Sequence, residues 1–294
     1  MSLPPDEPPP DATPPGDAPP PGDALPDALR PDVPPPASAA EVEAEALRLM
    51  RTVIDGGLRV RLMGGLAIRI QSPTASRPPY ERTYRDFDLV AHDKDVSALR
   101  RLLDADGYVG DKLFNAIHGA QRLVYSAPDG RWSVDIVIDR LEMSHTLDLK
   151  GRLATEGPTL DLADLLLTKL QIWETNRKDL GDAICLLADH PLAAVGRLSA
   201  TVGADGTPAP IDLVRLRSVL GADWGFCHTV ERNLRAVAEQ WAAAPIPDPP
   251  FAVDAQVATL LADLEAAPKS LGWKARARVG ERVRWYETPE EARR

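Results

Sequence analysis

The segment Arg85-Asp86-Phe87-Asp88-Leu89-Val90 places two carboxylates on an otherwise apolar stretch that is typical of a β-strand. Strand side chains alternate between two faces, so Phe87 and Leu89 point to one side and Asp86 and Asp88 to the other. Two neighbouring carboxylates repel each other and are costly to remove from water, so a buried pair calls for a cation, usually a metal. Such pairs are also common on solvated strand faces, and the surrounding sequence has to distinguish the two interpretations.

Upstream of this segment, a short strand ends in two glycines. Residues 60–63 are apolar enough for a strand, Gly64 and Gly65 follow, and a helix is expected to begin near Leu66. A strand, a glycine pair and a helix start leave backbone N–H groups uncovered, an arrangement that suits a phosphate. An ordinary tight turn is the alternative interpretation.

Downstream, a hairpin supplies a third carboxylate. Two strands, at residues 121–126 and 132–138, are separated by Pro128-Asp129-Gly130, which is a strong hairpin signal. On the second strand, Asp135 lies on the face opposite the apolar residues Val134 and Ile136. Asp135 can therefore sit on a strand beside the first two acids, and Arg122 on the partner strand is a weaker candidate for the same pocket.

From residue 159 the pattern becomes helical, and a lysine falls in the middle of an apolar face. The rotation of 3.6 residues per turn places Lys169 between Leu162, Leu165 and Trp173. A lysine in that position either extends its ammonium group to solvent or pairs with an anion. Residues 176–179 interrupt this helix, and Asp179 and Asp182 lie where they can cap the following helix.

The two ends of the chain have opposite charge. Residues 1–37 carry seven acidic residues against one arginine and more than half of the 29 prolines, so they are predicted to form a disordered, proline-rich acidic tail. Residues 269–284 carry six basic residues against Glu281, with Trp273 and Trp285 nearby. The basic stretch fits contact with a nucleic-acid backbone, and a charge-rich solvated helix is the alternative.

Composition limits the class of protein. The chain has 294 residues and a formal net charge of -10, which argues against broad nucleic-acid affinity. No apolar run approaches membrane-spanning length, no signal peptide is visible, and no contact with a membrane is expected. Cys185 and Cys227 lie in apolar helical patterns and are predicted to be core residues rather than a disulfide or a metal pair. These features predict a cytoplasmic protein.

The order of the motifs resembles that of a known enzyme superfamily. A strand, Gly-Gly and a helix, then Asp-x-Asp on a strand, then a single Asp on a later strand, is the pattern of the DNA-polymerase-β-like nucleotidyltransferases. The chain is most similar to bacterial AbiEii-type toxins, in which a downstream helix carries a lysine followed by an Arg/Lys-Asp-x-x-Asp segment. The gap between the glycines and the Asp-x-Asp pair is long here, and Thr83 lies one place early for the usual Arg-x-Thr-x-Asp. The matching residues are Gly64, Gly65, Asp86, Asp88, Asp135, Lys169, Asp179 and Asp182.

The resemblance implies an enzyme that moves a nucleoside monophosphate from an NTP to a hydroxyl group of an RNA end, a protein side chain or a small molecule. It implies that Asp86, Asp88 and Asp135 hold Mg²⁺ (or Mn²⁺) and that these acids act in catalysis together with Lys169. An antitoxin partner would accompany a toxin of this type. The implied nucleotide-binding residues are Gly64, Gly65, Lys169, Asp179 and Asp182, with Arg122 as the weaker candidate.

The expected fold is α+β, in three parts. After the tail at residues 1–37, a small mixed-sheet nucleotidyltransferase domain is expected at 38–155, followed by a helical C-terminal domain at 156–294. Two other functions remain open from the sequence. The first is a binding module that keeps this fold without turnover, and the second is a metal-dependent nuclease that uses the same acids without Gly64 and Gly65.

Overall fold

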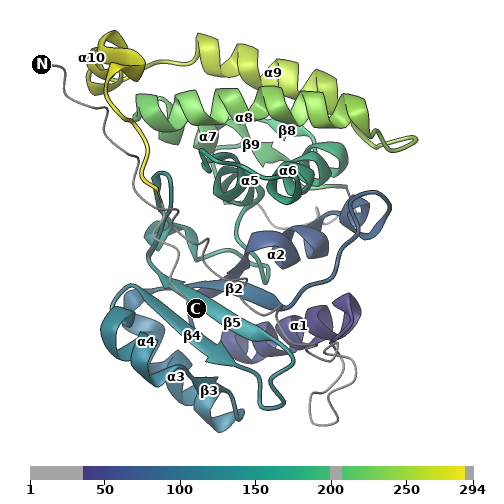
Figure 1. Ribbon diagram of the computed structural model, residues 1–294, viewed down its shortest axis with the longest axis vertical. Helices are drawn as coiled ribbons and strands as arrows, with labels where there is room; N and C mark the ends of the chain where they lie inside the picture. The colour runs from purple at the N-terminus through teal and green to yellow at the C-terminus, as the bar shows by residue number, and fades with distance from the viewer. Residues whose placement is uncertain (1–35, 199–206, 289–294) are drawn as a thin grey trace, which may run out of the picture. The chain divides into compact units, whose positions relative to one another are not determined.

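A five-stranded mixed sheet carries the Asp-x-Asp segment in the computed structural model of the chain (Figure 1), which describes residues 36–198 and 207–288. The strand order is β1-β2-β5-β4-β3. Strands β2 and β5 run parallel, whereas β1 pairs with β2, β4 with β5 and β3 with β4 in antiparallel fashion. The strands are β1 (Val60–Met63), β2 (Asp86–Ala91), β3 (Val109–Gly110), β4 (Arg122–Ser126) and β5 (Ser133–Ile138).

Helices that contact the sheet begin with local signals in the sequence. The first helix has the capping box that its sequence predicts, because the Glu41 N–H donates to the Ser38 hydroxyl while the Ser38 N–H donates to the Glu41 carboxylate at 2.8 Å. The α1 and α2 helices both contact β1 and β2, and α4 contacts β4. These helices are α1 (Ala39–Asp55), α2 (Gly64–Gln71), α3 (Val96–Ala105) and α4 (Lys112–His118).

The second half of the described chain is mostly helical. The α5 and α6 helices pack on each other and on α2, and α8 contacts α5, α6, α9 and α10. The rotation that placed Lys169 among leucines is correct, since Leu162, Leu165 and Leu166 are all buried. The helices are α5 (Leu162–Leu170), α6 (Arg177–Asp189), α7 (Leu213–Leu220), α8 (Trp224–Ala243), α9 (Val253–Ala266) and α10 (Leu271–Val279).

Several short elements complete the fold. They are the hairpin of β6 (Arg140–Glu142) and β7 (Thr146–Asp148), the pair of β8 (Leu192–Ala193) and β9 (Ile211–Asp212), and the 3-10 turns η2 (Pro73–Ser76), η3 (Asp93–Asp95), η4 (Lys150–Arg152) and η5 (Gly280–Arg282). The expectation that the chain is wholly helical beyond residue 159 therefore misses β8 and β9. The interruption between α5 and α6 also lies earlier than the predicted residues 176–179: it spans residues 171–176, because α5 ends at Leu170 and Asn176 caps α6, which begins at Arg177.

The segment that joins the sheet to the helices covers the β1 edge of the sheet. The Leu62 N–H donates to the Pro158 carbonyl at 2.8 Å, and the Leu160 N–H donates to the Leu62 carbonyl at 2.9 Å. These bonds satisfy backbone groups that an open edge would expose.

The fold class is α+β, with a small mixed sheet followed by helices, as predicted. The residues from 36 onward form one contact unit, so the division at residue 155 stays a prediction. The tail at residues 1–37 lies outside the described residues except for its last two, of which Ala37 is buried. Both cysteines are free and buried, as expected for core residues. Among the described helices, none combines the length and apolar character that a membrane crossing requires.

Candidate active site

The three predicted acids lie on one face of the sheet. In the parallel register of β2 and β5, Asp88 is the direct partner of Asp135, while Asp86 projects from the same face two residues earlier. The pKa of Asp88 is raised to about 7, mainly by burial and then by the charges of Asp86 and Asp135, against the opposing effects of Lys169 and Arg122. The site therefore has an excess of negative charge centred on Asp88.

Gly64 allows the Asp88 carboxylate to lie directly against the end of β1. Its φ of +72° is in the left-handed region, and a Cβ at this position would lie 2.0 Å from Asp88 Oδ2. At Gly65, a Cβ would lie 1.8 Å from Arg82 Nη2. The two glycines are thus the positions where a carboxylate and a guanidinium approach the backbone. The start of α2 beside them has no side-chain cap, which leaves N–H groups available to an anion.

Lys169 pairs with two carboxylates of α6. Its Nζ lies 2.9 Å from Asp179 Oδ1 and 3.0 Å from Asp182 Oδ2, and its side chain is 12% exposed. Burial alone would lower the pKa of Lys169, but the two carboxylates outweigh burial and raise it above its usual value. Of the two possibilities that the sequence left open, the ammonium group pairs with anions.

Arg82 is a site residue that the sequence analysis did not single out. Its Nη2 lies 2.7 Å from Asp182 Oδ2, so Asp182 is shared between Arg82 and Lys169. Arg82 also lies over the Tyr84 ring, with Cζ 4.9 Å from the ring centroid. A signal was present, because Arg82 occupies the arginine position of the Arg-x-Thr-x-Asp pattern, four residues before Asp86.

Arg122 lies beside Asp135, as its place on the hairpin predicted. The Arg122 Nε donates to Asp135 Oδ1 at 2.7 Å, and its Nη2 bonds to Oδ2. Both oxygens of Asp135 are therefore engaged by one planar guanidinium group. In the structure, Arg122 holds the third acid and partly balances the charge of the group.

A cavity of about 330 Å³ brings most of these groups together. Asp86, Gly65 and Asp182 do not line it: Asp86 is exposed at the start of β2, and Gly65 and Asp182 are adjoined by Arg82. Apolar and neutral residues complete the wall, among them Met63, Met143, Thr168 and Ile172. The predicted site residues that line the cavity are Gly64, Asp88, Arg122, Asp135, Lys169 and Asp179.

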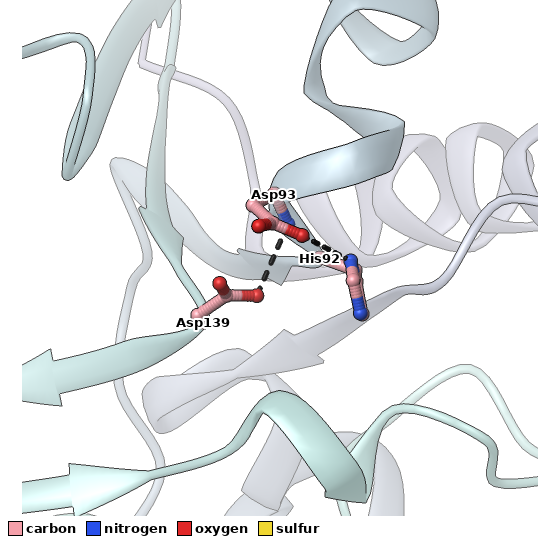
Figure 2. A group of neighbouring side chains, drawn as sticks. All are labelled: His92, Asp93 and Asp139. Carbon is pink, nitrogen blue, oxygen red and sulfur yellow. Dashed lines mark hydrogen bonds and ion pairs between the residues drawn. The ribbon is translucent and has the colours of Figure 1, made fainter.

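A second group of potential metal ligands lies at the carboxyl ends of β2 and β5 (Figure 2). Among residues 36–198 and 207–288, His92, Asp93 and Asp139 are the one set of three such side chains whose ligand atoms all lie within 4.8 Å of one another. The Lys150 ammonium already lies 2.9 Å from Asp93 Oδ2 and 2.8 Å from Asp139 Oδ2. A divalent cation could bind these three residues only if Lys150 moved away.

The chemistry of the Asp88 group fits a divalent cation better. Hard oxygen ligands suit Mg²⁺ or Mn²⁺, and burial with the charges of Asp86 and Asp135 raises the pKa of Asp88 despite Lys169 and Arg122. Asp86 and Asp88 could hold the ion on the open face of β2. Asp135 could join them once its ion pair with Arg122 loosens, because in the present arrangement the three acids are not within 4.8 Å of one another.

Comparisons with known proteins return little. No family model and no curated protein matches the chain. Among solved structures, the chain is similar to an antigenic nucleotidyltransferase-like protein from Paracoccidioides brasiliensis, at 14% sequence identity and a TM-score of 0.38. The match covers 81% of this chain and 98% of that one.

Proposed function

We propose that the chain is a metal-dependent nucleotidyltransferase, which moves a nucleoside monophosphate from an NTP to a hydroxyl acceptor. The observation that carries this proposal is the position of Asp88. Its carboxylate lies against Gly64, beside Asp135 in register, and in the same cavity as Lys169. The cavity therefore combines a pair of carboxylates that can hold a metal, a helix start whose N–H groups can receive phosphate, and the ammonium group of Lys169. Binding and cleavage of a triphosphate require these three kinds of group.

Each residue has a role that follows from its charge and place. A divalent cation bound by Asp86 and Asp88 would neutralise charge on the phosphates. The N–H groups at the start of α2 would receive the terminal phosphates, with Lys169 and Arg82 as the cations nearest to that end. Asp179 and Asp182 would orient those two cations before a nucleotide binds.

The reaction forms one bond and breaks one. The acceptor oxygen attacks the α-phosphorus, the bond from that phosphorus to the β-bridging oxygen breaks, and pyrophosphate leaves. The proton of the acceptor hydroxyl passes to a carboxylate, for which Asp135 is the candidate once its ion pair with Arg122 loosens, because it adjoins Asp88 in the cavity. Arg122 is a positioning residue for Asp135.

The finer assignments are part of the same proposal. The acceptor would be an RNA end, a protein side chain or a small molecule, and the ion would be Mg²⁺ or Mn²⁺. Membership of the AbiEii-type toxins, an antitoxin partner and a cytoplasmic location stay predictions from the sequence resemblance and composition.

A second candidate function has one observation in its favour. Because Arg122 engages both oxygens of Asp135, the third acid is not free to act as a ligand or a base in this arrangement. A binding module that keeps the fold and the nucleotide pocket without turnover would tolerate such a pairing. The nuclease interpretation gains no comparable support, since it gives no role to the close fit between Gly64 and Asp88.

Incubation with α-³²P-labelled NTPs, Mg²⁺ or Mn²⁺, and a crude mixture of RNA and protein tests the proposal. We expect label to move to an acceptor, and Asp88→Asn to lower that transfer by at least about a hundredfold, since metal stabilisation contributes several kcal/mol to the transition state. The matched control is Asp93→Asn, which removes a carboxylate from the group that Lys150 occupies and should leave transfer unchanged.

Three results would count against the proposal. Transfer that depends on Asp93 but not on Asp88 would place the metal at the other end of β2. NTP binding without transfer of label to any RNA or protein of the mixture would favour the binding module. Release of nucleotides from RNA without added NTP would favour the nuclease.

A further inference from the structure

We propose that a cavity between α8, α10 and the C-terminal segment binds an unpaired base of a single-stranded nucleic acid. This aromatic cavity measures about 480 Å³, within the range of about 300–1,000 Å³ typical of ligand sites. Four aromatic side chains line it, together with Arg276 and Arg284. The aromatic residues are Trp224, Trp273, Trp285 and Tyr286.

Two rings of the wall already stack on neighbouring side chains: Trp173 and Arg284 cover Tyr286, while His228 and Arg276 cover Trp224, so an incoming base would stack on a guanidinium plane or displace it. Tyr286 stacks on Trp173 with ring centroids 4.7 Å apart and planes 19° apart, and Trp285 meets Trp173 edge to face at 4.8 Å. Each arginine of the wall also lies over a ring: Arg276 Cζ is 4.8 Å from the Trp224 centroid, and Arg284 Cζ is 4.7 Å from the Tyr286 centroid. Aromatic rings and guanidinium planes are the two kinds of surface on which bases stack without regard to sequence.

The helix beside the cavity presents unpaired positive charge. Lys274 and Arg278 lie four residues apart on α10, and Arg282 follows in η5; all three are exposed. None of the three has an ion-pair partner within residues 36–198 and 207–288. The whole chain carries a net charge of -10, so this cluster contrasts with the rest of the protein and fits the phosphates of a strand whose base enters the cavity.

The two acids of the cavity wall leave room for this ligand. Asp223 is engaged as the cap of α8, because its Oδ1 accepts the Phe226 N–H at 3.0 Å, and Glu287 is exposed at the rim. The core of a protein–protein interface is typically apolar and poor in charged residues, whereas the wall of this cavity combines aromatic rings with guanidinium groups. The chemistry therefore favours a nucleic acid.

Neighbouring residues connect the aromatic cavity to the acidic cavity, which is the cavity of about 330 Å³ lined by Asp88, Asp135 and Lys169. Ile172 lines the acidic cavity, and the next residue, Trp173, stacks on Tyr286 of the aromatic one. The Glu287 N–H also donates at 2.9 Å to the carbonyl of Ser144, the residue after Met143 of the acidic cavity. A strand held by the aromatic cavity would thus lie next to the proposed catalytic groups, although its binding does not depend on nucleotidyl transfer.

The first test measures stacking. Fluorescence anisotropy with a 5′-labelled 12-nucleotide RNA of mixed sequence, in EDTA and without NTP, gives the dissociation constant of the full chain. We expect Tyr286→Leu to weaken binding by roughly five- to 150-fold, the range for loss of one base–aromatic stack. Tyr286→Phe keeps the ring and should bind like the parent, which separates stacking from loss of the side chain.

The second test measures charge. Lys274→Ala with Arg278→Ala removes two exposed cations, and should lower the slope of log K against log salt by about 1.4, at about 0.7 per phosphate contact on a single strand. The matched control is Arg100→Ala with Arg101→Ala on α3, which removes the same charge from exposed positions and should leave the slope unchanged. Thermal melts of both pairs verify that each is folded.

Five outcomes would overturn the proposal. The first is no binding of the RNA up to about 100 µM, the weak end of non-specific affinity. The second is equal loss with Tyr286→Phe and Tyr286→Leu, and the third is equal loss with the α3 control pair. The fourth is equal competition by a duplex of the same sequence, whose bases are already stacked, and the fifth is equal competition by a free mononucleotide. A single-stranded DNA competitor distinguishes a site for any single strand from an RNA-specific one.

Discussion

Asp88 provides the most direct physical test of the candidate site, because its charge should destabilise the protein whenever no cation is bound. The pKa of Asp88 is raised from 3.8 to about 7 by burial and then by Asp86 and Asp135. Replacing Asp88 with Asn keeps the size of the side chain and removes the charge. In the absence of divalent cations, the variant should therefore be more stable than the parent at neutral pH.

The magnitude follows from the size of the shift. A rise of about three pKa units corresponds to about 4 kcal/mol of unfavourable free energy for the charged form, at about 1.4 kcal/mol per unit. The Asn amide introduces donors that the site is not built to satisfy, which costs about 1–3 kcal/mol. We therefore expect Asp88→Asn to raise the free energy of unfolding by about 1–3 kcal/mol in EDTA at pH 8.

The pH dependence gives the sign. Below pH 3.8 the carboxyl is protonated in both the folded and the unfolded chain, so it makes no difference to stability. As pH rises from 3.8 to about 7, the unfolded chain loses this proton while the folded chain retains it, so the parent loses stability through that window. The advantage of Asp88→Asn should grow across the same window and be complete above about pH 7.

Urea unfolding in EDTA at pH 4.5, 6 and 8 is the measurement. Added Mg²⁺ should then stabilise the parent but not the variant, by about 2.7 kcal/mol at a hundred times the dissociation constant. Asp93→Asn is the matched control of opposite sign, because Lys150 lowers the pKa of Asp93. If Asp88→Asn is less stable than the parent in EDTA at pH 8, or its advantage is the same at all three pH values, the reasoning is wrong.

Three further predictions rest on other parts of the structure. Gly64→Ala combines a positive φ with a Cβ placed against the Asp88 carboxylate, so it should destabilise the protein more than Gly57→Ala, which has the same φ of +72° and open space; equal urea midpoints would contradict this. Lys169→Met leaves Asp179 without its ammonium partner, while Asp182 keeps Arg82, so it should lower the free energy of unfolding by about 1–3 kcal/mol, less than a fully broken buried ion pair; a melt like the parent's would show that the pairing contributes nothing. Burial lowers the pKa of His145 to about 4. The neutral imidazole therefore stabilises the fold fully above pH 6.5, and the free energy of unfolding falls by at most about 3 kcal/mol as pH decreases toward 4. His145→Phe should lack this decrease when urea unfolding is measured across the same pH range.

Local patterns predicted the parts of the site that lie on one element each. The alternation of the Asp86–Asp88 strand fixed the shared face of the two acids, and the hairpin signal placed Asp135 on a neighbouring strand. Local patterns do not predict which residues distant in the sequence interact with each other. Arg82 and Asp182 are 100 residues apart in the sequence, yet their side chains touch. Whether Lys169 contacts solvent or an anion likewise depends on where α6 packs, and the periodicity of one helix does not predict the position of another.

The shortest elements were also beyond reach. Strands β8 and β9 have two residues each, too few for an alternation of apolar and polar positions to be visible. The pairing of Arg122 with both oxygens of Asp135 could not be foreseen either, because the register of β4 against β5 sets it. The sequence therefore predicted six residues that line the cavity beside Asp88, but neither Arg82 nor which charges neutralise one another.

The carboxylates beside Lys169 compete with any anion that binds in the acidic cavity. Asp179 and Asp182 already lie at 2.9 and 3.0 Å from its ammonium, and Asp182 also engages Arg82. An incoming anion has to displace these internal competitors, and the displaced carboxylates then repel it. We expect a single orthophosphate to bring too little charge to displace them, whereas a triphosphate with a divalent cation would make several contacts at once. In the proposed function, the site would therefore discriminate by the number of linked phosphates before it contacts a base or a sugar.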